Sequence, residues 1–238
     1  MDGSGVDGQI GAAAVLYHDG VLRRERRMKL GSEKHHIVFE GEGVGLILGM
    51  ELIREGEMAD RMVPIGIDNI VAITATHAIK LGPSQYIWDI FHQRVVMTYN
   101  KHKGLDVLVK WTLGHMGIEG NEAADGEAKK AAKEGSSPTN KLPVPLRKPL
   151  PWSKSAMRQE FMRKLNLAAK KLWSESPRFN RIAHIDMDFK HNSFAKLSYN
   201  LHCERASLLF QLRVGHVPLN MYLHKIQKTD LPICLSCL

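Results

Sequence analysis

The sequence predicts an α/β domain followed by a basic, mostly helical extension, and three segments carry this prediction. Residues 10–17 (IGAAAVLY) form a small, apolar run that is typical of a buried strand. Residues 38–54 place apolar side chains at helical spacing, and residues 105–112 alternate between two faces as a strand does. Strands and helices mixed in this order are typical of a sheet flanked by helices.

Length and composition are those of a folded protein without a membrane span. The 238 residues, 44% of them apolar, are enough for one domain with an appendage or for two small domains. No apolar run reaches the ~20 residues that a membrane helix needs, so we expect no membrane partner. The N-terminal MDGSGVDG is neither a signal peptide nor a basic presequence, and three cysteines are too few for a disulfide scaffold. We therefore expect an intracellular protein, in the nucleus or the cytoplasm.

Composition divides the chain into three parts. We expect an α/β domain in residues 1–135, a Pro/Ser-rich linker in residues 136–151 and a helical extension in residues 152–238. Residues 1–140 hold 16 Lys/Arg against 19 Asp/Glu, whereas the remainder holds 17 against 6. A basic segment favours a polyanionic partner such as nucleic acid, although a solvated basic surface has the same composition.

The first two strands are expected to form a hairpin. His18-Asp19-Gly20 is a turn signal between the apolar run and residues 21–30. The second run contains five basic residues between Arg23 and Lys29, which suits an edge strand better than a central one. These charges either protect the edge or hold a nucleic-acid backbone, and the sequence favours neither.

The helix expected over residues 38–54 has a stripe of glycines. Gly41, Gly45 and Gly49 recur every four residues and therefore lie on one side. Each glycine lowers helix stability by ~1 kcal/mol relative to alanine. A smooth stripe would let the helix lie close to a sheet, which offsets that loss.

The remaining elements follow from periodicity and from stop signals. We expect a strand over residues 62–68, and helices over residues 69–81, 84–99, 121–133, 153–174 and 204–214. Asn121 is expected to cap the helix over residues 121–133, which has acidic residues in its first turns and basic residues in its last. The helix over residues 153–174 is expected to be basic and amphipathic.

Four carboxylates lie at element boundaries. Asp2 opens DGSG, and Glu42 lies in the first turns of the glycine-striped helix. Asp68 ends a strand, and Asp125 lies one turn into the last helix of the domain. A single aspartate at such a position is usually a turn residue or a cap. Together, however, carboxylates are the ligands that Mg²⁺ prefers, and two such ions ~4 Å apart can hydrolyse a phosphodiester.

The same carboxylates lie in sequence blocks that resemble a known family. DGSG, FEGEGVGLILG, IDN and GHMGIEGNEAAD match, in order and spacing, the four motif blocks of type 1 ribonucleases H. The chain is most similar to the ribonuclease H domain of non-LTR retrotransposon (reverse transcriptase) polyproteins. The last block is the most specific, and the resemblance covers roughly residues 1–135. LRVGHVPLNMYLHKI followed by CxxC more weakly resembles the region downstream of that domain.

The resemblance implies a five-stranded mixed sheet of order 3-2-1-4-5, flanked by helices. Asp2 would end the first strand and Asp68 the fourth, so that both lie at the crevice where strand order reverses. Because one residue precedes Asp2, we expect a truncated first strand. We also expect a monomer or a part of a larger polyprotein.

The resemblance further implies an endonuclease that cuts the RNA strand of RNA–DNA hybrids. Its two Mg²⁺ ions, replaceable by Mn²⁺, would be held by Asp2, Glu42, Asp68 and Asp125. Family members distinguish RNA from DNA largely through 2′-hydroxyl contacts.

Four further residues have implied roles near the substrate. His115 would help the product leave, and Asn69, Asn121 and Glu122 would contact or flank the substrate. Two other functions stay open: a catalytically inactive retroelement remnant that only binds nucleic acid, and an integrase-type transferase, against which the NEAAD block argues. Cys234 and Cys237 have zinc-knuckle spacing but make half a site, so we do not expect zinc.

Overall fold

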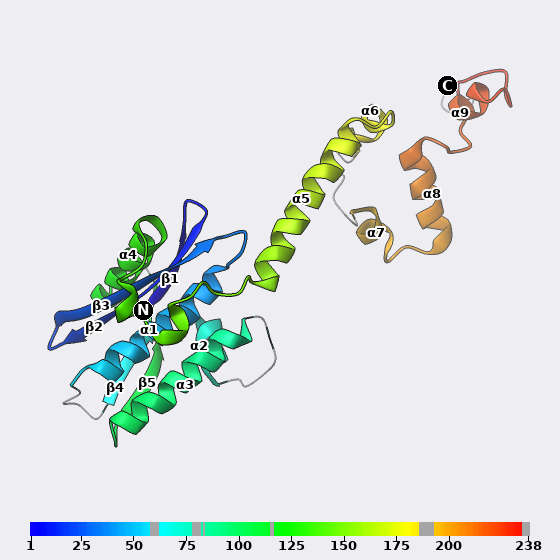
Figure 1. The fold of residues 1–238 in the computed structure, drawn as a ribbon. Helices are drawn as coiled ribbons and strands as arrows, with labels where there is room; N and C mark the ends of the chain where they lie inside the picture. Colours follow the sequence, from blue (N-terminus) through cyan, green and yellow to red (C-terminus); the bar gives the residue numbers. More distant parts are fainter. Residues whose placement is uncertain (58–61, 78–81, 83, 115–116, 186–192, 235–238) are drawn as a thin grey trace. The chain divides into compact units, whose positions relative to one another are not determined.

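The computed structural model describes residues 1–57, 62–77, 82, 84–114, 117–185 and 193–234, without the side chain of residue 181. The chain divides into two compact units, Met1–Phe161 and Met162–Leu238, which are described separately (Figure 1). The first unit is a mixed α/β structure, as the sequence predicts. The second is helical.

The first unit contains an antiparallel sheet of β1 (Asp2–Val6), β2 (Gln9–His18) and β3 (Val21–Ser32), in that order. Both connections are Asp-Gly turns. Asp7 and Gly8 have φ of 50° and 71°, and Asp19 and Gly20 have φ of 54° and 71°. Two successive positive φ angles give the turn type whose twist matches that of the strands, so the predicted hairpin is confirmed.

A second, parallel sheet pairs β4 (Met62–Ile67) with β5 (Asp106–Trp111). The expected single sheet of order 3-2-1-4-5 is therefore not formed among the described residues, which make sheets of three and two strands. The two sheets meet where the Met1 ammonium group donates to Gly66 O at 3.3 Å. Asp2 begins β1 rather than ending it, so the predicted place of Asp2 at the end of the first strand is wrong.

Two helices cover opposite faces of the antiparallel sheet: α1 (Val38–Glu55) and α4 (Glu119–Glu134) (Figure 1). Gly3 faces the backbone of α1. Gly11 is paired with Ser4, one residue further along β1, and therefore lies on the other face, where it contacts the backbone of α4. Each helix thus approaches the sheet at a position that has no side chain.

The predicted role of the glycine stripe is confirmed. A Cβ atom at Gly45 would lie 3.1 Å from Asp2 O and 3.2 Å from Ala13 O, closer than an ordinary contact. A Cβ atom at Gly41 would lie 3.1 Å from both Gly3 Cα and Gly11 O. A Cβ atom at Gly49 would meet the Met1 side chain. The stripe therefore lets α1 rest on β1 and β2.

The remaining helices of the first unit lie close to their predicted positions. α2 spans Ile70–His77, residues 78–81 of its predicted range are outside the described part, and α3 spans Gln85–Lys101 and packs on α1. α4 begins at Glu119, with Ile118 at its cap, so the prediction that Asn121 caps it is wrong. Asn121 is instead buried in the first turn of the helix.

The proline-rich segment 136–151 is packed on the first unit rather than being an open linker. It contains two short 3₁₀ turns, η1 (Thr139–Lys141) and η2 (Val144–Leu146). Leu142, Leu146 and Leu150 are buried in the main hydrophobic core. Prolines stop regular structure but leave leucines free to pack, so the compact unit extends past the predicted boundary at residue 135.

The basic run on β3 has a structural use at two of its positions. Arg26 is buried and forms a bidentate pair with Glu55 of α1. Arg27 pairs with Glu127 at 3.1 Å and with Glu134 at 3.3 Å, both on α4. These two arginines tie the edge strand to the helices on either face.

Helices α5 (Lys154–Ser174), α6 (Phe179–Ile182), α7 (Ser193–Ser198), α8 (Cys203–Val214) and α9 (Asn220–Lys225) complete the chain. The predicted helices over residues 153–174 and 204–214 are confirmed to within one residue. The predicted apolar face of α5 is largely exposed. None of the described helices combines the length and the apolar character of a membrane span. Cys234 is exposed, and Cys237 is outside the described residues.

Candidate metal centre

Three of the predicted carboxylates come together at the junction of the two sheets. Asp2 begins β1, Glu42 lies in the second turn of α1, and Asp68 follows β4. Each offers one carboxylate oxygen, and these oxygens all lie within 4.8 Å of one another. Glu42 follows Asp2 by 40 positions and Asp68 follows Glu42 by 26, yet the three side chains form one cluster. Asp2 and Glu42 are buried, and Asp68 is half-buried.

Local backbone packing sets these positions. Gly3 lies directly against the backbone of Gly41 and Glu42, so the absence of a side chain at Gly3 brings Glu42 next to β1. Asp68 is held by the end of β5, where Trp111 Nε1 donates to Asp68 O at 3.2 Å. A Cβ at Gly114 would lie 2.8 Å from Asp68 Oδ2, so this glycine also makes room for the carboxylate.

The fourth predicted carboxylate, Asp125, adjoins the cluster through Asp2. Asp125 lies close enough to Asp2 to raise the pKa of that carboxyl group. Asp125 Oδ2 also accepts a 2.6 Å bond from Lys129 Nζ, one turn further along α4. Asp125 is therefore buried beside the cluster, with its charge compensated by a lysine that the sequence reasoning missed. The i, i+4 spacing of an acid and a lysine on a helix is the signal that points to this pair.

The predicted substrate residues have varied surroundings. Asn69 Oδ1 accepts from Val71 N and Ala72 N at 3.0 and 3.1 Å and so caps α2. The Asn69 side chain also acts to lower the pKa of Glu42, against the larger effect of burial. Asn69 thus caps a helix that begins next to the cluster, a role that sequence reasoning did not foresee.

The two predicted residues of α4 differ in burial. Asn121 lies one turn before Asp125 on the same helix face, and its Oδ1 is buried without a hydrogen-bond partner in the described part of the chain. Glu122 is exposed and accepts from Gly117 N at 3.4 Å. His115 lies outside the described residues.

Uncompensated negative charge dominates the cluster. Burial raises the pKa of Glu42 to about 8, and the charges of Asp2 and Asp68 act in the same direction. Burial, the Asp68 charge and the neighbouring Asp125 carboxyl group raise the pKa of Asp2 to about 7. The Met1 ammonium group lies near all three carboxylates, but burial lowers its pKa, which weakens it as a counter-charge.

The donor set fits a hard divalent cation. Glu42 Oε2 is buried and has no hydrogen-bond partner among the described residues. A buried carboxylate oxygen without a donor is unfavourable unless a cation or a proton compensates it. Oxygen ligands from three carboxylates are the coordination that Mg²⁺ and Mn²⁺ accept, whereas zinc prefers nitrogen and sulfur. The arrangement can therefore hold a divalent cation at the edge of both sheets.

Comparison of the chain with protein-family models, with curated proteins and with solved structures gave no match.

Proposed function

We propose that this protein is a metal-dependent nuclease of the ribonuclease H class, which hydrolyses the RNA strand of RNA–DNA hybrids. The observation that carries the proposal is the cluster of Asp2, Glu42 and Asp68, in which a buried Glu42 oxygen has no donor. Each of these residues lies in one of the sequence blocks that resemble type 1 ribonucleases H. Residues that lie in three separate motif blocks of the sequence are therefore neighbours in the structure.

The chain's own residues would prepare the site in two ways. Asp2, Glu42 and Asp68 would hold the cation, and Asn69 acts on Glu42 from the start of α2. Asp125 adjoins Asp2, and the bond from Lys129 Nζ holds its side chain in place. Bound Mg²⁺ would supply activation of a water molecule and stabilisation of the leaving oxygen of a phosphodiester. No protein nucleophile is needed for this hydrolysis.

The finer fold assignment belongs to the same proposal. In this assignment the antiparallel sheet of β1 to β3 and the parallel pair of β4 and β5 would be the two parts of a 3-2-1-4-5 sheet. The hydrogen bond from Met1 to Gly66 joins them beside the carboxylates. This arrangement supports a crevice between β1 and β4, the kind of place where open α/β sheets bind ligands.

The test is cleavage of a hybrid whose RNA strand carries a 5′ label, in the presence of Mg²⁺. We expect the RNA strand to be cut, while double-stranded DNA of the same sequence stays intact. Asp68→Asn removes one ligand charge without changing side-chain shape and should abolish cutting. Asp19→Asn is the matched control, because Asp19 is exposed in a hairpin turn whose positive φ suits asparagine.

Three outcomes contradict the proposal. Cleavage that persists in Asp68→Asn would mean that another site or another protein cuts the RNA. Hybrid that binds but is never cut by the folded wild-type chain would favour the inactive, nucleic-acid-binding alternative. Equal loss of activity in Asp19→Asn and Asp68→Asn would show that the assay reports folding rather than the metal centre.

A further inference from the structure

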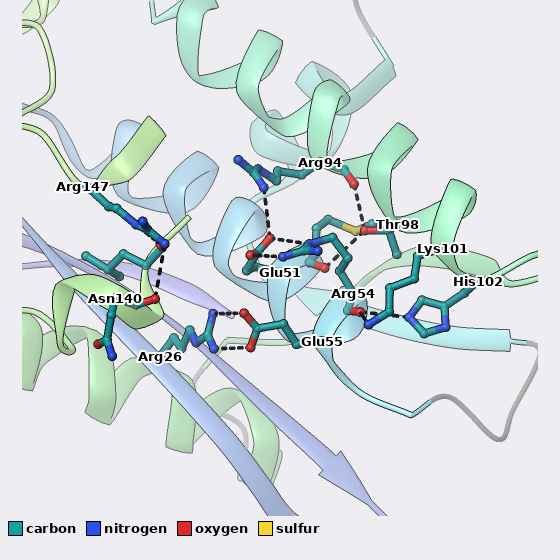
Figure 2. Close-up of polar contacts among 12 residues, drawn as sticks. Arg26, Glu51, Arg54, Glu55, Arg94, Thr98, Lys101, His102, Asn140 and Arg147 are labelled. Atoms are coloured by element: carbon teal, nitrogen blue, oxygen red, sulfur yellow. Dashed lines mark hydrogen bonds and ion pairs between the residues drawn. The ribbon is translucent and has the colours of Figure 1, made fainter. Parts of the chain in front are cut away.

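A second charged site lies at the far end of α1. Glu51 Oε2 accepts from Arg54 Nε at 3.0 Å and from Arg94 Nη1 at 3.3 Å (Figure 2). Glu51 Oε1 accepts from Arg54 Nη2 at 2.6 Å. One carboxylate therefore serves two guanidinium groups, one from α1 and one from α3.

Positive charge exceeds negative charge in this network. The side chains of Arg26, Arg54, Arg94 and Lys101 are set against the two carboxylates Glu51 and Glu55 (Figure 2). Burial acts to raise the pKa of Glu51, but the neighbouring arginines hold it below its usual value, so Glu51 is ionised. Each of the three arginines contacts a carboxylate, but the four cationic groups outnumber the two carboxylates, so this network carries a net charge of +2.

The donors of this network are not all used. Arg94 is 8% exposed, and its Nε is buried without an acceptor in the described part of the chain. Lys101 Nζ donates to Arg54 O at 2.7 Å, which occupies one of its three protons. Buried and half-buried guanidinium groups are normally paired, so excess charge of this kind favours an anion nearby.

A surface cavity of about 770 Å³, broadly open to solvent, adjoins these donors. Arg54, Arg94, Lys101 and Asn100 form its polar wall, and Met97, Val144 and Pro145 form its apolar wall. Cavities of ~300–1,000 Å³ hold small organic ligands, whereas a bare phosphate ion would fill only a small part of this one. The cavity is also separate from the metal centre, since Arg54 follows Glu42 by 12 positions on α1, or ~18 Å.

We propose that this cavity binds a phosphomonoester of nucleotide size. The phosphate group lies against Arg54, Arg94 and Lys101, because planar guanidinium groups bind phosphate oxygens in pairs. The organic part lies against Met97, Val144 and Pro145. The segment that supplies Val144 and Pro145 is the proline-rich one that packs on the first unit, so the ligand contacts both α3 and this segment.

The test is calorimetric titration of the full chain with adenosine 5′-monophosphate, inorganic phosphate and adenosine. We expect saturable binding of the monophosphate, weaker binding of phosphate and none of adenosine. Val144 is 64% exposed, so both Val144→Asp and Val144→Asn should fold. Both variants lose the apolar contact of Val144, but only aspartate adds a negative charge beside the bound anion, so we expect Val144→Asp to bind about tenfold more weakly than Val144→Asn.

A second pair of variants tests the phosphate donors. Lys101→Met should weaken binding, and Lys103→Met, an exposed lysine two residues further on, should not. Asp68→Asn should bind the monophosphate normally, which separates this site from the metal centre. Absence of saturable binding by wild type, equal binding by Val144→Asp and Val144→Asn, or equal binding of adenosine and its monophosphate would overturn the proposal.

Discussion

Replacing Glu42 by glutamine should stabilise the metal-free protein while removing its response to divalent cations. Burial and the charges of Asp2 and Asp68 raise the pKa of Glu42 from 4.5 to about 8. The folded protein therefore holds a proton that the unfolded chain releases between these pH values. Stability falls as pH rises through this window, because the folded state is the one that binds more protons.

The structure sets the size of the effect. At pH 7 the medium lies ~2.5 pH units above the ordinary pKa of Glu42, and each unit corresponds to ~1.36 kcal/mol, so the ionisable group destabilises the fold by about 3 kcal/mol. Glutamine keeps part of the burial cost, since its amide is also polar. We therefore expect Glu42→Gln to gain about 1–2 kcal/mol, which raises the Tm by ~2–8 °C for a chain of this size.

The assay is thermal unfolding in EDTA and in Mg²⁺, at several pH values between 5 and 8. Wild type should lose Tm with rising pH in EDTA and recover it in Mg²⁺. Glu42→Gln should lose less Tm with rising pH, because only Asp2 still titrates in this range, and should not respond to Mg²⁺. Glu57→Gln, at an exposed position, is the matched control and should behave like wild type. A Tm for Glu42→Gln in EDTA at pH 8 equal to or below that of wild type would refute the reasoning.

Three further predictions concern the surroundings of the cluster. The Tm gained on adding Mg²⁺ should be larger at pH 8 than at pH 6, because Asp2 and Glu42, with pKa values of about 7 and 8, must lose protons to bind it; an equal gain would contradict metal binding at these residues. Gly3→Ala should destabilise the fold by ~3 kcal/mol or more in urea unfolding, since the new methyl group meets the backbone of α1. Gly126→Ala, in open space on α4, should instead stabilise it by ~0.5–1 kcal/mol. Lys129→Met should tighten Mn²⁺ binding in calorimetry, because it removes a cationic charge bound to Asp125; unchanged or weaker binding would show that Lys129 does not oppose the cation.

The regular elements were largely predictable because their signals are local. The Asp-Gly turn of the first hairpin and the apolar periodicity of α1 each depend on neighbouring residues alone. The start of α4 was not predictable in this way. Asn121 is a good capping residue, but packing against the sheet extends the helix by two residues and buries Asn121 inside it.

The proline-rich segment 136–151 illustrates the limits of composition. Its prolines indicate an open linker, whereas its three leucines pack in the core. Ser136 Oγ and Ser137 Oγ accept from the backbone of β3 at 2.9 and 3.1 Å, which holds the start of the segment in place. Whether such a segment packs depends on the surface that it contacts. Part of that surface is β3, which lies 107 to 110 positions earlier in the sequence.

By itself, the sequence determined the α/β class of the first unit, the glycine stripe of α1 and the identity of the carboxylates that form the cluster. These follow from residue type, spacing and motif, which need no coordinates. Only the tertiary structure decided that Glu42 has an oxygen without a donor, that Lys129 holds Asp125, and that two arginines share Glu51 beside a cavity. The reason is physical: the energy of a charge depends on its burial and on its distance to other charges, and both are set where segments distant in the sequence meet.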